Sequence, residues 1–216
     1  MTLILTLERA NLEDVVTVSS YAASMPDVQL NIREGEQYRL KDLLYSLMLE
    51  SHNDTAVAIA EHVGGSMTNF AKMMTERAAE LGCVGTKFTN AHGLHDEEHY
   101  TTVYDLYLIF QNALKNETFR EICGSTSYTA SFQNSSGENI TVEWENTMQY
   151  FTRNKIPPKD VTVLAGKTGT TTKALSCLAL LSENKAGEEF ISIILKSQDR
   201  GVLYNEMNDL LEEINK

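Results

Sequence analysis

The run Lys167-Thr168-Gly169 offers a cation, a hydroxyl group and an open stretch of backbone at the edge of an extended segment. Such a strand edge can hold a peptide carboxylate and pair with an extended ligand at the same time. Gly169 fits this interpretation because a side chain there would block the approach of another backbone. The tripeptide is short, and an ordinary turn explains it as readily.

A second polar motif, Ser51-His52-Asn53, follows a strongly apolar helical segment and opens another one. A junction between two helices can direct two polar side chains into a cleft. The alternative is a helix cap, because Ser and Asn both accept hydrogen bonds from the free N–H groups at a helix start. Each motif is therefore ambiguous when taken alone.

The elements that must position these motifs follow from hydrophobic periodicity. Helical spacing predicts helices over residues 1–10, 38–49, 53–62, 66–81, 101–114 and 203–214. Extended segments are predicted at 15–18, 127–132, 140–144, 161–166, 175–182 and 190–196, with a turn at 134–139 closing a hairpin. A helix-rich first half followed by strands and a last helix indicates an α+β fold with an antiparallel sheet.

Length and charge limit the function classes further. The 216 residues fit one domain, residues 1–216. The chain has 30 acidic and 18 basic residues, and its net charge of -12 argues against a function in binding nucleic acid. The sequence shows neither a signal peptide nor an apolar run of the ~20 residues that a membrane span needs.

Taken together, Ser-x-Asn followed by Lys-Thr-Gly belongs to the active-site set of penicillin-binding proteins and class A β-lactamases. The chain resembles the low-molecular-weight D-alanyl-D-alanine carboxypeptidases in particular, through residues 49–66 (LESHNDTAVAIAEHVGGS), 86–94 (TKFTNAHGL), 99–106 (HYTTVYDL) and 146–147 (NT). The resemblance implies a β-lactamase/transpeptidase-like fold, with a helical cluster beside an antiparallel sheet that lacks its N-terminal strands.

The resemblance also implies catalytic roles at three positions. Ser51 would relay a proton to the leaving amine, Asn53 would hydrogen-bond the amide of the substrate, and Lys167 would set the electrostatics around Ser51. No metal and no cofactor are implied. The substrate would be a peptidoglycan pentapeptide ending in D-Ala-D-Ala, processed outside the cytoplasmic membrane, and the full-length enzyme would also bind β-lactams.

Four further residues are expected on the substrate side of the site. Thr168 would bind the terminal carboxylate, Gly169 would leave the backbone open, and the N–H of Thr170 would donate to the oxyanion. His92 belongs to the His-Gly-Leu segment of the family.

The third family motif, Ser-x-x-Lys, supplies the nucleophile and its activating lysine. Its match here, Ser182 to Lys185, follows Lys-Thr-Gly in a turn-like stretch, which is the wrong order and context. By alignment, the family motif would lie just upstream of Met1, so we expect an N-terminally truncated and inactive chain. Loss of the nucleophile costs ~10⁶ in turnover in a comparable serine hydrolase. Sheet edge left open by missing strands would favour a homo-oligomer.

Three alternatives remain open at this point. His92, His95 and His99 could share a metal, although Asn90 and Gly93 indicate a loop. A class A β-lactamase would need a further glutamate, for which the strand-like segment 140–145 contains the candidates Glu143 and Glu145. A non-catalytic, peptidoglycan-binding relic would lack the nucleophile altogether. An in-frame Ser-x-x-Lys encoded upstream of the Met1 codon would favour the enzyme over the relic.

Overall fold

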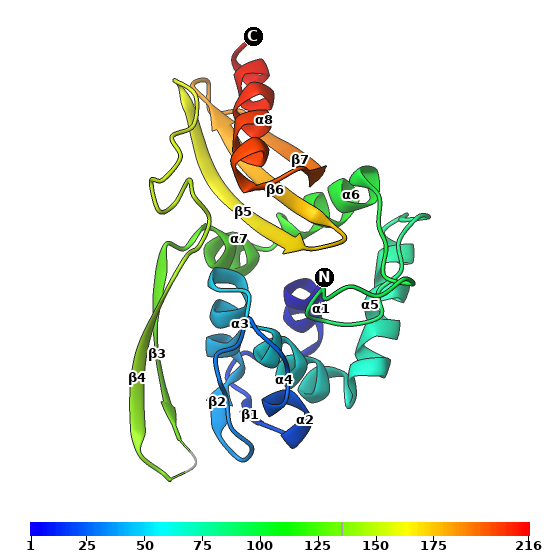
Figure 1. The fold of residues 1–216 in the computed structure, drawn as a ribbon, viewed down its shortest axis with the longest axis vertical. Helices are drawn as coiled ribbons and strands as arrows, with labels where there is room; N and C mark the ends of the chain where they lie inside the picture. Colours follow the sequence, from blue (N-terminus) through cyan, green and yellow to red (C-terminus); the bar gives the residue numbers. More distant parts are fainter. Residues whose placement is uncertain (135) are drawn as a thin grey trace.

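The computed structural model describes residues 1–134 and 136–216, so Ser135, within the predicted turn at 134–139, lies outside the described residues. Helices form one part of the molecule, and a sheet with a covering helix forms the other (Figure 1). The helices are α1 (Thr2–Arg9), α2 (Ser20–Ala23), α3 (Leu40–Leu49), α4 (Asn53–Gly64), α5 (Met67–Glu80), α6 (Val103–Ala113), α7 (Glu117–Gly124) and α8 (Arg200–Glu212). The strands are β1 (Val15–Thr17), β2 (Gln37–Arg39), β3 (Ser127–Gln133), β4 (Asn139–Glu145), β5 (Val161–Thr171), β6 (Leu175–Asn184) and β7 (Glu189–Ser197).

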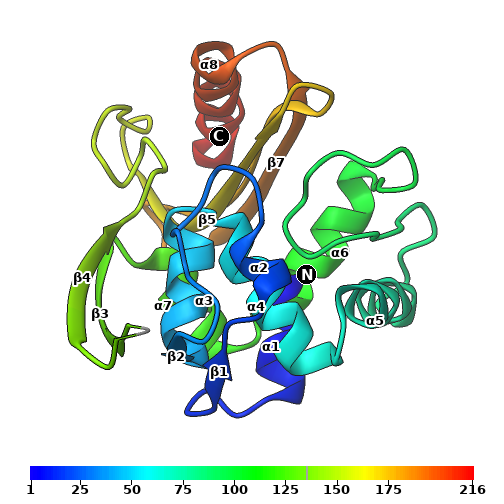
Figure 2. The ribbon, with the colours of Figure 1, turned by 60° about the horizontal axis from the view of Figure 1, so that its bottom comes forward.

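The strands form two antiparallel sheets. One has the order β1-β2-β3-β4, in which β3 and β4 are the predicted hairpin, and the other has the order β5-β6-β7. Helix α8 packs on β6 and β7, while α6 and α7 lie between this sheet and the remaining helices (Figure 1). The hairpin stands on the opposite side of the molecule from α5 (Figure 2). The predicted α+β class is confirmed.

The hydrophobic core has two clusters that meet at the sheet. The larger cluster fills the helical part and includes the fully buried Leu43 and Ile59, and the smaller one lies under α8 and includes Leu180 and Met207. Ala165 of β5 belongs to the larger cluster. The strand that carries Lys-Thr-Gly is therefore anchored to the helical part by its own apolar residues.

Two predicted boundaries were wrong for identifiable reasons. The helix expected from residue 38 begins at Leu40, because Tyr38 and Arg39 form part of β2, where a buried Tyr38 alternates with exposed neighbours. The last helix begins at Arg200 rather than at residue 203, because the Asp199 side chain caps it by accepting a hydrogen bond from the N–H of Val202 at 2.9 Å.

Two glycines of β5, three residues apart, give a stability test. Gly166→Ala should lower the free energy of unfolding by about 1–3 kcal/mol, because its Cβ would lie 2.6 Å from Cδ2 of Leu180 and 2.8 Å from the carbonyl oxygen of Ala179. Gly169→Ala is the matched control, since no atom lies within 4 Å of a Cβ built there. Urea denaturation of both variants measures the difference, and equal stabilities would contradict this packing.

Candidate active site

The Ser51-His52-Asn53 motif lies where α3 ends and α4 begins. Glu50 closes α3, and Ser51 follows with a φ of 65°, in the left-handed region. This conformation costs a non-glycine residue about 1–2 kcal/mol, so the surrounding contacts must hold it. The N-cap of α4 is His52, whose side chain makes no capping hydrogen bond. The alternative that Ser51 or Asn53 caps the helix is therefore wrong.

Asn53 is buried and fixed by the segment that precedes β2. Its backbone N–H donates to the carbonyl oxygen of Val28 at 2.8 Å, and its side-chain Nδ2 donates to the carbonyl oxygen of Pro26 at 3.0 Å. In the described part of the chain, no group donates a hydrogen bond to the Asn53 Oδ1. The amide oxygen is thus the atom of this side chain that remains for an N–H group of a ligand.

Lys167 reaches the same place from the sheet. Strand β5 extends beyond the predicted end to Thr171, so Lys167 lies within the strand, opposite Ala179 of β6, and not in a turn. Its Nζ donates to the Oγ of Ser51 and, at 3.0 Å, to the carbonyl oxygen of Thr168. Folding therefore brings together two motifs that lie 116 residues apart in the sequence.

The environment of Lys167 changes its acidity. Burial of the ammonium group is the main cause that lowers the pKa of Lys167 to about 8; Cys123 acts in the opposite direction, and the Arg200 guanidinium contributes to the lowering. The ammonium form still predominates at pH 7. Because the pKa lies near neutrality, Lys167 is suited to exchange a proton with a neighbouring hydroxyl group.

The residues after Lys167 continue along β5 toward solvent. Thr168 is partly buried, and Gly169 and Thr170 are exposed. The space around Gly169 shows that the fold itself does not require glycine there, whereas Gly166 is required because both Leu180 and Ala179 crowd its α-carbon. The packing constraint on β5 therefore falls on Gly166 and not on Gly169, the glycine that the Lys-Thr-Gly motif contains.

His92 is not connected to the other candidate residues. Its Nδ1 accepts a hydrogen bond from the N–H of Leu94 at 3.1 Å, and burial together with the neighbouring His99 lowers the pKa of its imidazole. Within the described ranges, no hydrogen bond or ion pair joins His92 to Ser51, Asn53 or Lys167. A role for His92 in substrate binding stays a prediction.

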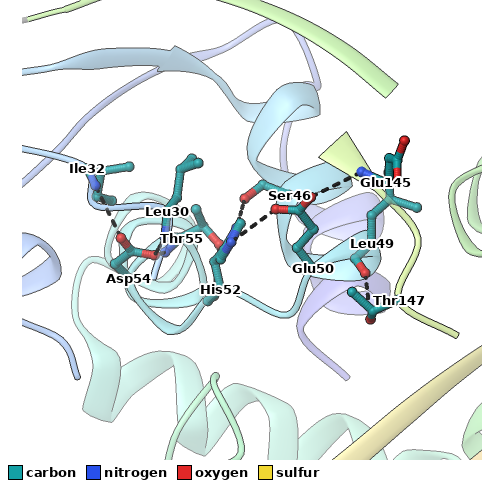
Figure 3. Close-up of polar contacts among 10 residues, drawn as sticks. All are labelled: Leu30, Ile32, Ser46, Leu49, Glu50, His52, Asp54, Thr55, Glu145 and Thr147. Carbon is teal, nitrogen blue, oxygen red and sulfur yellow. Dashed lines mark hydrogen bonds and ion pairs between the residues drawn. The ribbon is translucent and has the colours of Figure 1, made fainter. Parts of the chain in front are cut away.

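The polar groups around His52 were not found by sequence reasoning. Figure 3 shows the imidazole between the side chains of Ser46 and Glu50, with Asp54 on the other side of the α4 start. Ser46 lies on the buried face of α3, which is mostly leucine, and it is completely buried. In the sequence, a serine within a mostly apolar helical run, six residues before a histidine, is a weak signal of this contact.

Other sequence motifs lie in unsuitable surroundings. Ser182 is completely buried in β6, and Glu143 and Glu145 are exposed in the hairpin strand β4. Over residues 1–134 and 136–216, no group of three or more His, Cys, Asp and Glu side chains is placed to hold a metal. His99 instead accepts a hydrogen bond from the N–H of Thr89. None of the helices described in the structure has the length and apolar character needed to cross a bilayer.

Comparisons with known proteins identify the family of this chain. The sequence model of the D-alanyl-D-alanine carboxypeptidase family, peptidase family S11, matches residues 1–199. The chain belongs to this family. Among curated members, it is 35% identical over 130 residues to the D-alanyl-D-alanine carboxypeptidase DacF of Bacillus subtilis, a match that covers 58% of this chain and 33% of that protein. It is 28% identical to the D-alanyl-D-alanine carboxypeptidase of Streptomyces sp. strain K15, over 90% of this chain and 68% of that protein.

Solved structures of the family agree with the fold. The R248L mutant of the Streptomyces K15 DD-transpeptidase superposes with a TM-score of 0.88 at 26% identity, covering 98% of this chain and 84% of that one. A D-alanyl-D-alanine carboxypeptidase from Mycobacterium tuberculosis H37Rv superposes with a TM-score of 0.84 at 22% identity, which supports the fold alone. The transpeptidase-like fold expected from the motifs is confirmed.

Titration of Lys167 gives a stability prediction for this carboxypeptidase-family site. The folded-state pKa of about 8 lies below the ordinary value of 10.5, so between these values the unfolded chain binds more protons and stability rises with pH. Relative to Lys167→Met, the parent chain should gain up to about 3 kcal/mol across this window. Urea denaturation below pH 8 and above pH 10.5 measures the change.

The exposed Lys173 provides the control for that titration. Lys173→Met should shift the free energy of unfolding equally at both pH values, because its ammonium group is not buried. If the difference in free energy of unfolding between the parent and Lys167→Met does not vary with pH, burial does not lower the pKa of Lys167.

Proposed function

We propose that residues 1–216 form the body of a single acyl-transfer domain that takes peptidoglycan stem peptides ending in D-Ala-D-Ala. The observation that carries this proposal is the hydrogen bond from Lys167 to Ser51, which joins the two family motifs. Membership of the D-alanyl-D-alanine carboxypeptidase family supports the same substrate class. The match spans one third of the length of the Bacillus subtilis relative, so the proposal concerns this part of such a protein.

The geometry supports distinct roles for the three inner residues. Ser51 relays a proton to the leaving amine, because its hydroxyl contacts a lysine whose pKa is about 8. Asn53 receives an amide N–H of the substrate at its Oδ1, since its Nδ2 is already committed to Pro26. Lys167 supplies positive charge beside Ser51 and attracts the anionic end of the peptide.

The outer residues bind the substrate along β5. Thr168 binds the terminal carboxylate, Gly169 leaves room for the peptide backbone, and Thr170 donates its N–H to the developing oxyanion. The exposure of Gly169 and Thr170 supports these assignments. His92 contributes to the same side of the site through the loop that contains it.

The nucleophilic serine is not among residues 1–216 in this proposal. Ser182 is buried in β6, and the order of the motifs is wrong for it. A polypeptide of these residues should bind the peptide without forming an acyl-enzyme. A non-catalytic peptidoglycan-binding relic would use the same residues. The proposed site works outside the cytoplasmic membrane, where peptidoglycan lies, and needs no cofactor.

A peptide-binding experiment tests the substrate class. An N-acetylated peptide ending in D-Ala-D-Ala should shift the amide resonances of Ser51 and Thr168, and its affinity should fall as the pH rises through about 8, because Lys167 loses its charge. The same peptide ending in L-Ala-L-Ala is the control. Equal binding of the two peptides, or no binding, would refute the proposed substrate.

Labelling with a fluorescent penicillin tests the nucleophile. The 216-residue chain should show no covalent label after denaturing electrophoresis. A labelled band that withstands denaturation would demonstrate a nucleophile within these residues and would contradict the proposed inactivity.

We further propose that two copies of the chain associate through β7. This strand pairs with β6 on one side, and no other described strand pairs with its second edge. A groove of about 650 Å³ runs beside it, between α6, β7 and α8, and its lining includes Tyr104, Tyr107, Ile191, Ile193 and Leu210. Tyr104 is 67% exposed. An apolar sheet edge beside an apolar groove favours strand addition by a second copy.

Replacement of a groove residue tests this association. Ile193→Lys should keep the chain monomeric, because the ammonium group would have to be buried at the interface. Val84→Lys is the control, since Val84 is 98% exposed and lies away from the groove. Sedimentation velocity should show a dimer fraction that rises with concentration in the parent and in Val84→Lys. A parent chain that is monomeric at every concentration would exclude the dimer.

A further inference from the structure

His52, the middle residue of the Ser51-His52-Asn53 motif, is buried and has a polar partner near each ring nitrogen. Only 5% of the residue is exposed. Its Nδ1 lies 2.7 Å from the Oγ of Ser46, and its Nε2 lies 3.3 Å from the Oε2 of Glu50 (Figure 3). The side chain therefore points back toward α3 and away from the substrate-binding strand β5.

The two contacts determine the tautomer of His52. A carboxylate attracts a protonated ring nitrogen, so the proton is assigned to Nε2, which faces Glu50 at ion-pair distance. The unprotonated Nδ1 then accepts from the hydroxyl of Ser46. A neutral imidazole satisfies both contacts, whereas an imidazolium cannot accept from Ser46.

These bonds form a bridge over Ser51. Glu50 precedes Ser51 and His52 follows it, and their side chains are joined to each other while the backbone of Ser51 adopts its left-handed conformation. The bridge holds the backbone on both sides of Ser51. The Oγ of Ser51 projects from this constrained turn to Lys167.

The bridge is anchored to two other parts of the chain (Figure 3). The second oxygen of Glu50 accepts from the backbone N–H of Glu145 at 3.1 Å, and Thr147 donates to the carbonyl oxygen of Leu49. On the α4 side, Asp54 accepts from the backbone N–H groups of Leu30 and Ile32, as Figure 3 also shows. The position of His52 is therefore set by the end of β4 and by the segment before β2.

We propose that His52 is a positioning residue for Ser51: its neutral imidazole, held by Ser46 and Glu50, keeps the Ser51 backbone left-handed and its Oγ directed at Lys167. The inference rests on the proposed function only in taking Ser51 as part of the site. It adds that the titration of His52 makes the position of Ser51 depend on pH, an effect that comes from neither Ser51 nor Lys167.

The direction of the pH effect follows from the groups that face the ring. Burial lowers the pKa of His52 below the ordinary value of 6.5, while the negative charges of Glu50 and Asp54 act in the opposite direction. His52 is therefore neutral at pH 7. As the pH falls through the lowered pKa, Nδ1 gains a proton and can no longer accept from Ser46, so the hydroxyl must turn to accept from the ring and the contacts that constrain Ser51 change. Because the unfolded chain binds this proton first, stability also falls below pH 6.5.

An NMR pH titration of the 216-residue chain tests the proposal. The ring resonances of His52, the amide of Ser51 and the side chain of Lys167 should change with one shared midpoint below pH 6.5. Ser46→Ala should raise that midpoint, because the neutral ring loses its donor. Glu50→Gln should lower it, because the ring loses a negative neighbour. The Ser51 midpoint should follow His52 in both variants.

Two histidine variants complete the experiment. His52→Leu should abolish the low-pH transition of Ser51, whereas His62→Leu at the other end of α4, where His62 contacts Asp14, should leave it unchanged. If Ser51 and Lys167 show no transition at the His52 midpoint, or if Ser46→Ala and Glu50→Gln move the His52 midpoint alone, His52 is only structural and the proposal is overturned. None of these readouts depends on peptide binding or acylation, so failure of the proposed function would not alter them.

Discussion

The contact between the Lys167 ammonium group and the Ser51 hydroxyl joins the two halves of the molecule at one point. It requires β5 to lie close against the helical part, which the buried Ala165 and the close packing of α7 on β5 make possible. Gly124 of α7 shows how close this is, because a Cβ there would lie 2.6 Å from the carbonyl oxygen of Leu164. A side chain at Gly124 would therefore separate α7 from β5, the strand that carries Lys167.

The same contact also determines the electrostatics of the site. A lysine in water would have a pKa near 10.5, and burial beside the helical part lowers it to about 8. The Cys123 thiol experiences the complementary effect, since burial raises its pKa to about 12 and keeps it neutral. Among the described residues, no carboxylate forms an ion pair with Lys167, and its ammonium group faces the Ser51 hydroxyl.

Much of this arrangement could be predicted from the sequence, because periodicity locates α3 and α4 and the order of two short motifs indicates the family. The helix break at Ser51 and a strand that ends beside Lys167 were both expected. The left-handed backbone of Ser51 could not be predicted, since nothing in its type distinguishes it from a helix cap. The bonds of His52 to Ser46 and Glu50 depend on how α3 ends, and periodicity does not describe helix ends. The hypothesis that the Asn53 side chain caps a helix was wrong for a similar reason. The side chain donates instead to Pro26, and Pro26 lies in a segment without regular structure.

The 116 residues that separate Ser51 from Lys167 have a consequence for how the site is made. Closing a loop of this length costs chain entropy that a single hydrogen bond does not offset, so the contact depends on the sheet and helices that surround it. β5 obtains its backbone partners from β6, which ends at Asn184. During synthesis, the helical segments can therefore collapse well before the site exists, and the contact between Ser51 and Lys167 forms only after most of the chain has been made.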